Sequence, residues 1–197
     1  MSRHRWIITA IAACLIAASP CVASAATTGL LRQPVKSVLE SSQFFQFYHL
    51  AVDSVGTESD GKQIYYCRPS GGPLRDLAQV VVGADRNRNV YEVALTLARS
   101  FVDDPKNGKY ARDITAYFLR WVPAPDEAQE LSRLSSRILN PSSGVTLTDP
   151  DFARSFAIFN GKNDSVFRPL STKTMMLFEN DKTDRGTRVL SIFLSRI

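Results

Sequence analysis

Histidine and cysteine, which carry much of the chemistry of enzymes and metal sites, are scarce in this chain. Its 197 residues include 2 histidines and 3 cysteines. A zinc site needs several converging ligands of these types, and calcium loops and phosphate-binding glycine loops need fixed spacings that this sequence does not have. The exposed-serine elbow, Gly-x-Ser-x-Gly, is also missing. We therefore predict no catalytic residues of a conventional kind, no cofactor and no metal.

Long hydrophobic runs are missing beyond the first residues. A charged segment at residues 3–5 precedes an uncharged run at residues 6–18, and residues 23–25 (Ala-Ser-Ala) form the pattern after which a signal peptidase cuts. No run reaches the roughly 18 to 20 apolar residues that a membrane-spanning helix requires. We predict that residues 1–25 are a cleaved signal peptide, and that the protein is periplasmic without a transmembrane span. The apolar run before Cys14 is short and continues past it, which disfavours a lipoprotein.

The distribution of charged residues along the sequence does not predict a basic surface for binding a nucleic acid. The formal net charge is +5, and removal of Arg3 and Arg5 with the signal peptide lowers it by two, to +3. The remaining lysines and arginines are interspersed with acidic residues, so no basic stripe stands out. We expect the partner to be another protein of the cell envelope, and the sequence leaves the oligomeric state open.

The central prediction is an amphipathic helix over residues 89–102. Asn89 is a favourable N-cap, and Glu92 stands where its carboxylate can complete a capping box. Apolar residues follow at helical spacing. They are Val90, Val93, Ala94, Leu97, Ala98 and Phe101.

Similar patterns predict further helices, while other segments stay ambiguous. Helical spacing covers residues 35–52, 74–81, 110–121, 128–138 and 150–159, the last with Asp149 as N-cap. Residues 44–52 also fit a strand, and residues 62–68 look extended. After residue 170 the chain fits two strands or two short helices.

These patterns predict a mainly α fold, a compact helical domain of about five to seven amphipathic helices. A C-terminal β-hairpin is an open addition, and α+β is the alternative class. The Ser- and Gly-rich break at residues 141–147 suggests a boundary. The predicted organisation is a signal peptide (1–25), a helical core domain (26–140) and a C-terminal extension packed on the core (141–197).

Cys67 and His49 are the only thiol and imidazole of the predicted mature chain, because Cys14 and Cys21 leave with the signal peptide. They support the alternative of a thiol-dependent envelope enzyme. Alternation in an extended segment places Cys67 opposite the more apolar pair, Ile64 and Tyr66, and favours its exposure. A lone thiol in an oxidising compartment is safer when buried, and cannot form an intramolecular disulfide. We predict that Cys67 is buried.

Four blocks of the sequence resemble a known family. They are residues 45–53 (FQFYHLAVD), 66–69 (YCRP), 74–82 and 90–101. In this order they are similar to the small exported Tai-type immunity proteins, which neutralise type VI amidase effectors. The family's glycines in the aromatic helix are absent, and Phe44 or Phe45 stands where it has a cysteine, so its disulfide has no counterpart. Only Cys67 and Pro69 are carried over, as turn residues.

The resemblance implies a non-catalytic periplasmic protein that binds another protein and neutralises a toxin or effector. Loops on a rigid scaffold are the usual place for such an interface. The polar candidates are residues 57–61, 85–88 and 161–164.

Overall fold

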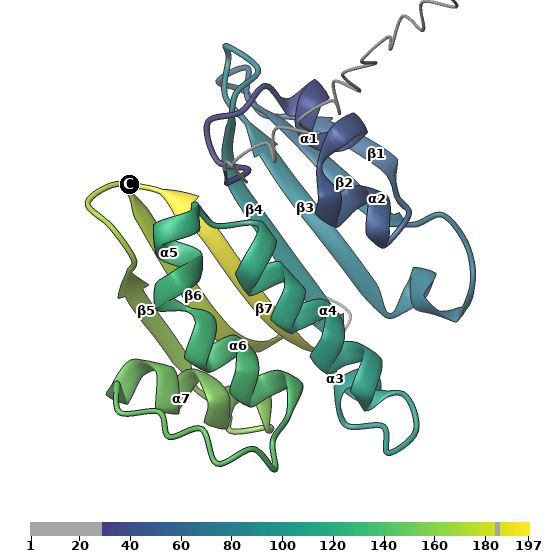
Figure 1. Ribbon diagram of the computed structural model, residues 1–197. Helices are drawn as coiled ribbons and strands as arrows, with labels where there is room; N and C mark the ends of the chain where they lie inside the picture. The colour runs from purple at the N-terminus through teal and green to yellow at the C-terminus, as the bar shows by residue number, and fades with distance from the viewer. Residues whose placement is uncertain (1–28, 184–185) are drawn as a thin grey trace, which may run out of the picture.

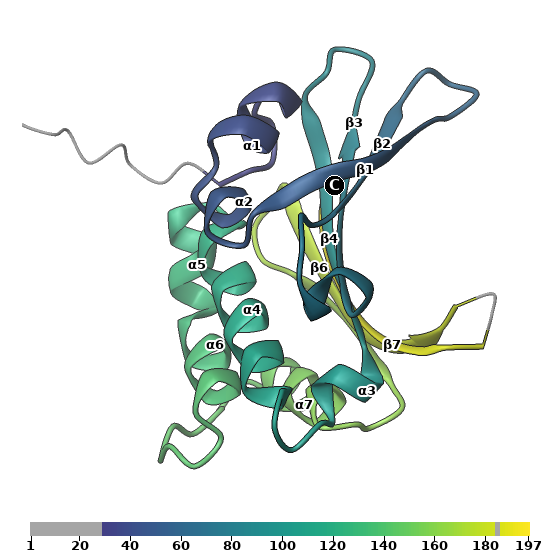
Figure 2. The same ribbon diagram turned by 90° about the vertical axis from the view of Figure 1, so that its right-hand side faces the viewer.

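The computed structural model describes residues 29–183 and 186–197, so the predicted signal peptide and Cys14 lie outside the described residues. Seven strands form one antiparallel sheet in the order β1-β2-β3-β4-β7-β6-β5, with helices layered on one face (Figures 1 and 2). The strands are β1 (Leu50–Thr57), β2 (Gln63–Pro69), β3 (Ala78–Ala84), β4 (Val90–Ala98), β5 (Ser165–Pro169), β6 (Thr174–Lys182) and β7 (Arg188–Arg196). The helices are α1 (Val35–Ser41), α2 (Gln43–Phe47), η1 (Pro73–Asp76), α3 (Arg99–Val102), α4 (Gly108–Trp121), α5 (Pro125–Glu130), α6 (Ser132–Leu139) and α7 (Pro150–Phe159).

The prediction of a mainly α fold is wrong, because the protein is α+β. The segment predicted as the central helix forms β4, followed by the single turn α3. Val93, Leu95 and Leu97 face the helices, and Ala94, which points to the other face, is also buried. Because β4 carries apolar residues on both faces, it lacks a simple alternation, and its apolar residues also match helical spacing.

The prediction of a helix over residues 74–81 is also wrong, again because apolar residues on both faces of a strand match helical spacing. Its first residues form the short η1, and β3 follows. Val80 and Val82 are fully buried under the helices, while Val81 is half-buried on the opposite face. Three consecutive β-branched residues favour a strand more than the helical spacing favours a helix.

Residues 44–52 combine the two structures that the sequence left open. The helix α2 takes the first aromatic residues, with the Ser42 hydroxyl accepting the Phe45 backbone N–H at 3.4 Å. The strand β1 starts at Leu50. Between them His49 has a φ of 48°, a left-handed conformation that ends the helix and turns the chain into the sheet.

The helices predicted after residue 105 are confirmed. α4 matches the aromatic pattern of residues 110–121, and α5 and α6 share the segment predicted over 128–138. The Asp149 carboxylate caps α7 by accepting the backbone N–H groups of Asp151 and Phe152 at 2.9 and 3.1 Å. None of the helices in the described part of the chain is long and apolar enough to cross a membrane.

The C-terminal strands join both parts of the chain into one sheet. β6 and β7 form the hairpin that the sequence left open, and β7 pairs with β4, with Leu95 opposite Ile192. Residues from both sides of the predicted boundary at 141 therefore share a single core. The helix layer covers that core, and the opposite face carries no α-helix among the described residues (Figure 2).

Candidate functional site

Cys67 and His49 are not assembled as a nucleophile and base. Cys67 pairs with Val52, and His49 precedes Val52 by three residues, which is about 10 Å along a strand. Burial raises the pKa of the Cys67 thiol to about 12, and the thiol donates to the Tyr65 carbonyl oxygen at 3.9 Å. His49 is exposed. Thiol catalysis requires an accessible thiolate, and the buried Cys67 thiol does not provide one.

The burial predicted for Cys67 is confirmed, since its side chain is fully buried. The alternation in β2 places Cys67 on the helix-covered side and leaves Tyr66 on the other. The more apolar pair therefore faces away from the helices, which the pattern alone did not predict. The placement of Cys67 and Pro69 in a turn is wrong, because both residues belong to β2.

Asp103 and Asp104, two neighbouring acidic residues after α3, stabilise the local structure. Among the described residues no three His, Cys, Asp or Glu side chains converge as a metal site. Asp103 forms an ion pair with Arg99. One carboxylate oxygen of Asp104 accepts the backbone N–H groups of Lys106 and Asn107 at 2.7 and 2.8 Å.

The uncovered face of the sheet carries a continuous row of apolar side chains. Strand pairing aligns one such residue from each of six strands. This apolar row consists of Phe167 (β5), Leu177 (β6), Phe193 (β7), Ala94 (β4), Val81 (β3) and Tyr66 (β2). Phe167 is 64 % exposed and Tyr66 36 %, while Ala94 is covered by its neighbours. An antiparallel sheet with one solvated face normally has polar side chains at such positions.

Two carboxylates flank the apolar row. Glu92 lies on β4, two residues before Ala94, and Glu179 lies on β6, two residues after Leu177, so they are on the same face at opposite sides of the row. Burial raises the pKa of both carboxyl groups, helped by Glu58 near Glu92 and by Asp181 near Glu179. Neither carboxylate has an ion pair or hydrogen bond among the described residues.

Beside Glu92, the side chain of Tyr91 occupies the space that a Cβ atom on Gly83 would need. A Cβ atom at Gly83 would come within 2.7 Å of the Tyr91 ring, so a larger residue would displace it. The ammonium group of Lys62 lies 5.5 Å from the centre of the same ring. This end of the uncovered face is therefore tightly built.

A cavity of about 310 Å³ lies between α2, α4 and η1 on the helix-covered side. Its walls are mostly aromatic and aliphatic, and Asp113 is the only charged residue among the described residues that line it. We call it the aromatic cavity; it is lined by Phe47, Tyr48, Leu74, Ala78, Phe101, Tyr110, Asp113, Ile114 and Tyr117. Burial, and then the negative charge of Asp113, raise the pKa of Tyr48 well above its usual value.

The chain matches none of the protein-family models, curated proteins or solved structures with which it was compared. The resemblance to Tai-type immunity proteins stays a prediction. The roles of the uncovered face and of the cavities are inferred from their own geometry and chemistry.

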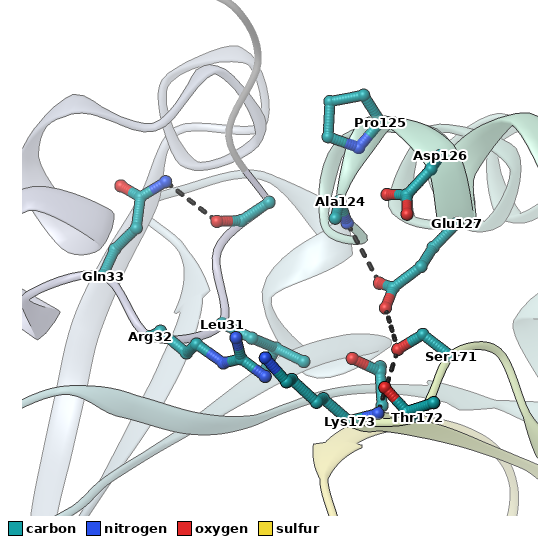
Figure 3. A pocket seen from close by; sticks show the side chains of 12 residues that line it. Leu31, Arg32, Gln33, Ala124, Pro125, Asp126, Glu127, Ser171, Thr172 and Lys173 are labelled. Atoms are coloured by element: carbon teal, nitrogen blue, oxygen red, sulfur yellow. Dashed lines mark hydrogen bonds between the residues drawn. The ribbon is translucent and has the colours of Figure 1, made fainter.

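A second cavity lies where residues 29–33, the start of α5 and the turn between β5 and β6 meet (Figure 3). Buried Glu127 lines it, and its carboxylate oxygens accept the Ala124 backbone N–H at 3.1 Å and the Ser171 hydroxyl at 2.8 Å. Figure 3 shows Arg32 and Lys173 reaching toward each other in the same space. Since both oxygens of Glu127 are bonded, this carboxylate is structural and holds α5 to the turn.

The polar loops predicted as interface candidates each join two elements and make local contacts, and their role as an interface stays a prediction. Residues 57–61 and 85–88 join β1 to β2 and β3 to β4, and they contact each other where Arg86 donates to the Asp60 carbonyl oxygen. Residues 161–164 join α7 to β5, and Asp164 pairs there with Arg154 at 2.7 Å. The apolar row and the aromatic cavity were both missed. One signal was present for the cavity, because Tyr110, Asp113 and Tyr117 share one face of a helix at spacings i, i+3 and i+7.

Proposed function

We propose that this protein is a non-catalytic protein-binding protein of the periplasm, and that it binds its partner through the uncovered face of the sheet. The observation that supports this proposal is the apolar row, which runs across six of the seven strands without interruption. Exposed apolar side chains that are contiguous, and bordered by polar groups, are typical of interaction surfaces.

The dimensions of the row suit a protein partner better than a small molecule. Six neighbouring strands span about 24 Å, at about 4.8 Å per strand spacing. The middle of the row is low, because Ala94 lies between Val81 and Phe193. A broad surface of low relief can be covered by another protein but does not enclose a small ligand.

The flanking carboxylates define the chemistry of the partner. Glu92 and Glu179 are partly desolvated and have no cationic partner among the described residues. A partner with an apolar ridge and a lysine or arginine on each side of it would bury the row and pair with both carboxylates. In keeping with the resemblance to immunity proteins, we propose a toxin or effector of the cell envelope as this partner.

Affinity capture from an envelope extract tests the proposal when it is done with matched variants. The wild-type protein should capture a specific partner. Phe167→Ser removes the most exposed ring of the row, and Glu179→Lys reverses a flanking charge, so each variant should capture at least about tenfold less of the same partner. Circular dichroism and a melting curve check that both variants remain folded.

The control is Val55→Ser, which removes a 49 % exposed apolar side chain of β1. Val55 pairs with Tyr65 and so lies on the other side of the sheet from Tyr66. This variant should capture the partner as the wild type does. Equal capture by all variants would overturn the assignment of the surface, and a concentration-dependent doubling of mass in light scattering, lost in Phe167→Ser, would identify a second copy of this chain as the partner instead.

A further inference from the structure

We propose that the aromatic cavity is a binding site for an organic cation that carries N–H groups, namely a primary ammonium or a guanidinium. This site is independent of the uncovered face, because it lies among the helices on the other side of the sheet. The geometry that supports it is a cluster of rings around one carboxylate and one buried hydroxyl.

The rings form a connected wall at the opening of the cavity. The centre of the Phe47 ring lies 5.0 Å from Tyr48 and 5.8 Å from Tyr117, and Tyr117 stacks on Trp121 at 4.6 Å. Phe47 is 58 % exposed although it contacts three other rings. The face of an aromatic ring is negative, so several rings around one space attract a cation.

Asp113 supplies the full negative charge. Among the described residues it is the only charged one that lines the cavity, and none of the described basic side chains lines it. Its carboxylate has no ion pair or hydrogen bond to any described residue. A carboxylate that faces an apolar cavity without a counter-ion favours a cationic ligand and disfavours an anionic one.

Tyr48 restricts the ligand further. Its hydroxyl oxygen is buried and has no hydrogen-bond partner in the described structure. Tyr48 and Asp113 line the same cavity, so a ligand that reaches the buried hydroxyl as well as the carboxylate meets two hydrogen-bond acceptors. An ammonium or guanidinium group can donate to both, whereas a quaternary ammonium has no N–H to donate. The site should therefore prefer N–H cations to quaternary ones.

None of the described basic side chains of the chain fills the cavity. The ammonium group of Lys109 lies 6.0 Å from the centre of the Tyr110 ring, but Lys109 does not line the cavity. A second hollow continues outward from Phe47, Tyr48 and Leu74 along Ser70 and Gly71. This groove offers room for the rest of a longer ligand, so the cation can be a free amine or the end of a lysine or arginine side chain.

Titration of the purified protein with small probes tests the proposal. The tryptophan fluorescence is a suitable signal, because Trp121 contacts Phe47 and Tyr117. Butylamine and Nα-acetyl-lysinamide should bind saturably. Nα-acetyl-norleucinamide, which is neutral, and tetramethylammonium, which has no N–H, should each bind at least about tenfold more weakly. Binding of butylamine without binding of Nα-acetyl-lysinamide would indicate that the ligand is a free amine. Tighter binding of Nα-acetyl-lysinamide than of butylamine would indicate that the ligand is a side chain.

Variants identify the site. Asp113→Asn keeps the shape and removes the charge, and should weaken butylamine binding by at least about tenfold. Tyr48→Phe removes only the unpaired hydroxyl, so it should remain folded and should weaken binding severalfold. Asp126→Asn, at an exposed position outside the cavity, is the control and should bind as the wild type does. Equal binding of the neutral probe, equal binding by Asp113→Asn or Tyr48→Phe, or no saturable binding would each overturn the proposal.

Discussion

The two faces of the sheet are built from neighbouring residues of the same strands, yet they have different roles. The helix-covered face has its own row of six, one residue along from the apolar row in each strand, and all six are at most 2 % exposed. They are Val166, Phe178, Ile192, Leu95, Val80 and Cys67. Apolar residues of these strands therefore form both the core and an exposed surface. Only the helix layer, which covers one of the two faces, distinguishes them.

The helix layer buries one face of the sheet because it packs large apolar side chains against it. Phe118 and Leu119 of α4 and Leu134 and Ile138 of α6 are fully buried against the sheet. The opposite face carries no α-helix from the described part of the chain. The covered row therefore contributes its full hydrophobic free energy to stability, and the apolar row keeps part of it available for binding.

The largest expected effect comes from truncating adjacent residues of β6 on opposite faces. Phe178→Ala leaves a cavity in the core and should lower the free energy of unfolding by about 3–5 kcal/mol. Leu177→Ala removes a half-buried side chain and should lower it by only about 1 kcal/mol. Denaturant unfolding of both variants measures the difference. Equal losses would show that the uncovered face is part of the core.

A buried arginine at the end of the covered face should give the next largest effect. Arg99 donates to the Phe159 carbonyl oxygen at 2.8 Å and pairs with Asp103, and it is almost completely buried. Arg99→Met leaves that carbonyl without its donor, so it should lower the free energy of unfolding by about 2–3 kcal/mol.

The comparison for Arg99 is Arg154, which makes two hydrogen bonds of 2.7 Å to Asp164 at the surface. Exposed ion pairs contribute little, so Arg154→Met should cost clearly less than Arg99→Met. Thermal unfolding of the two variants side by side gives the ranking. The reverse order would mean that the anchoring of α7 depends on the surface pair.

The thiol of Cys67 probes how tightly the covered face is closed. Because burial raises its pKa to about 12, native protein at neutral pH should not react with iodoacetamide, whereas protein in denaturant should. Cys67→Ala should lower the free energy of unfolding by about 1 kcal/mol through lost packing. Mass spectrometry detects the alkylation. Rapid labelling of the native protein would mean that β2 opens readily from the helices.

The smallest effect concerns Glu92 on the uncovered face. Its pKa is raised in the folded state, so the folded protein holds this proton more strongly than the unfolded chain does. The contribution of Glu92 is therefore most favourable below the ordinary glutamate pKa of 4.5 and is lost as the pH rises through the folded value. Glu92→Gln should stabilise the protein at neutral pH by about 0.5 kcal/mol.

Unfolding of Glu92→Gln and wild type between pH 4 and about pH 7 measures this dependence. The two stabilities should converge toward the acidic end and separate toward neutral pH. A bound partner that supplies a cation to Glu92 should cancel the advantage of the variant. If the stabilities of the two proteins differ by the same amount at every pH, the pKa of Glu92 is not raised on the uncovered face.

The sequence predicted the helices where local chemistry is strong and failed where packing decides. α7 was predicted correctly because Asp149 caps it and a proline stands at its first turn. β4 was predicted as a helix because Asn89 resembles a cap and its apolar residues fit a period of 3.6. The competing strand is favoured by pairing with β3 and β7, which are distant in the sequence and cannot be seen in a local window.

The amino-acid sequence by itself determined which side chains are available. After residue 25 the chain has one histidine and one cysteine, and its abundant apolar residues support a full core. The tertiary structure decided where those residues lie, because strand pairing aligns side chains from six strands that no local pattern connects. It also brought Phe47 of α2, and Tyr48 directly after it, to the Asp113 carboxylate of α4, which is more than sixty residues later in the chain. These residues, which no local sequence pattern connects, together form the aromatic cavity.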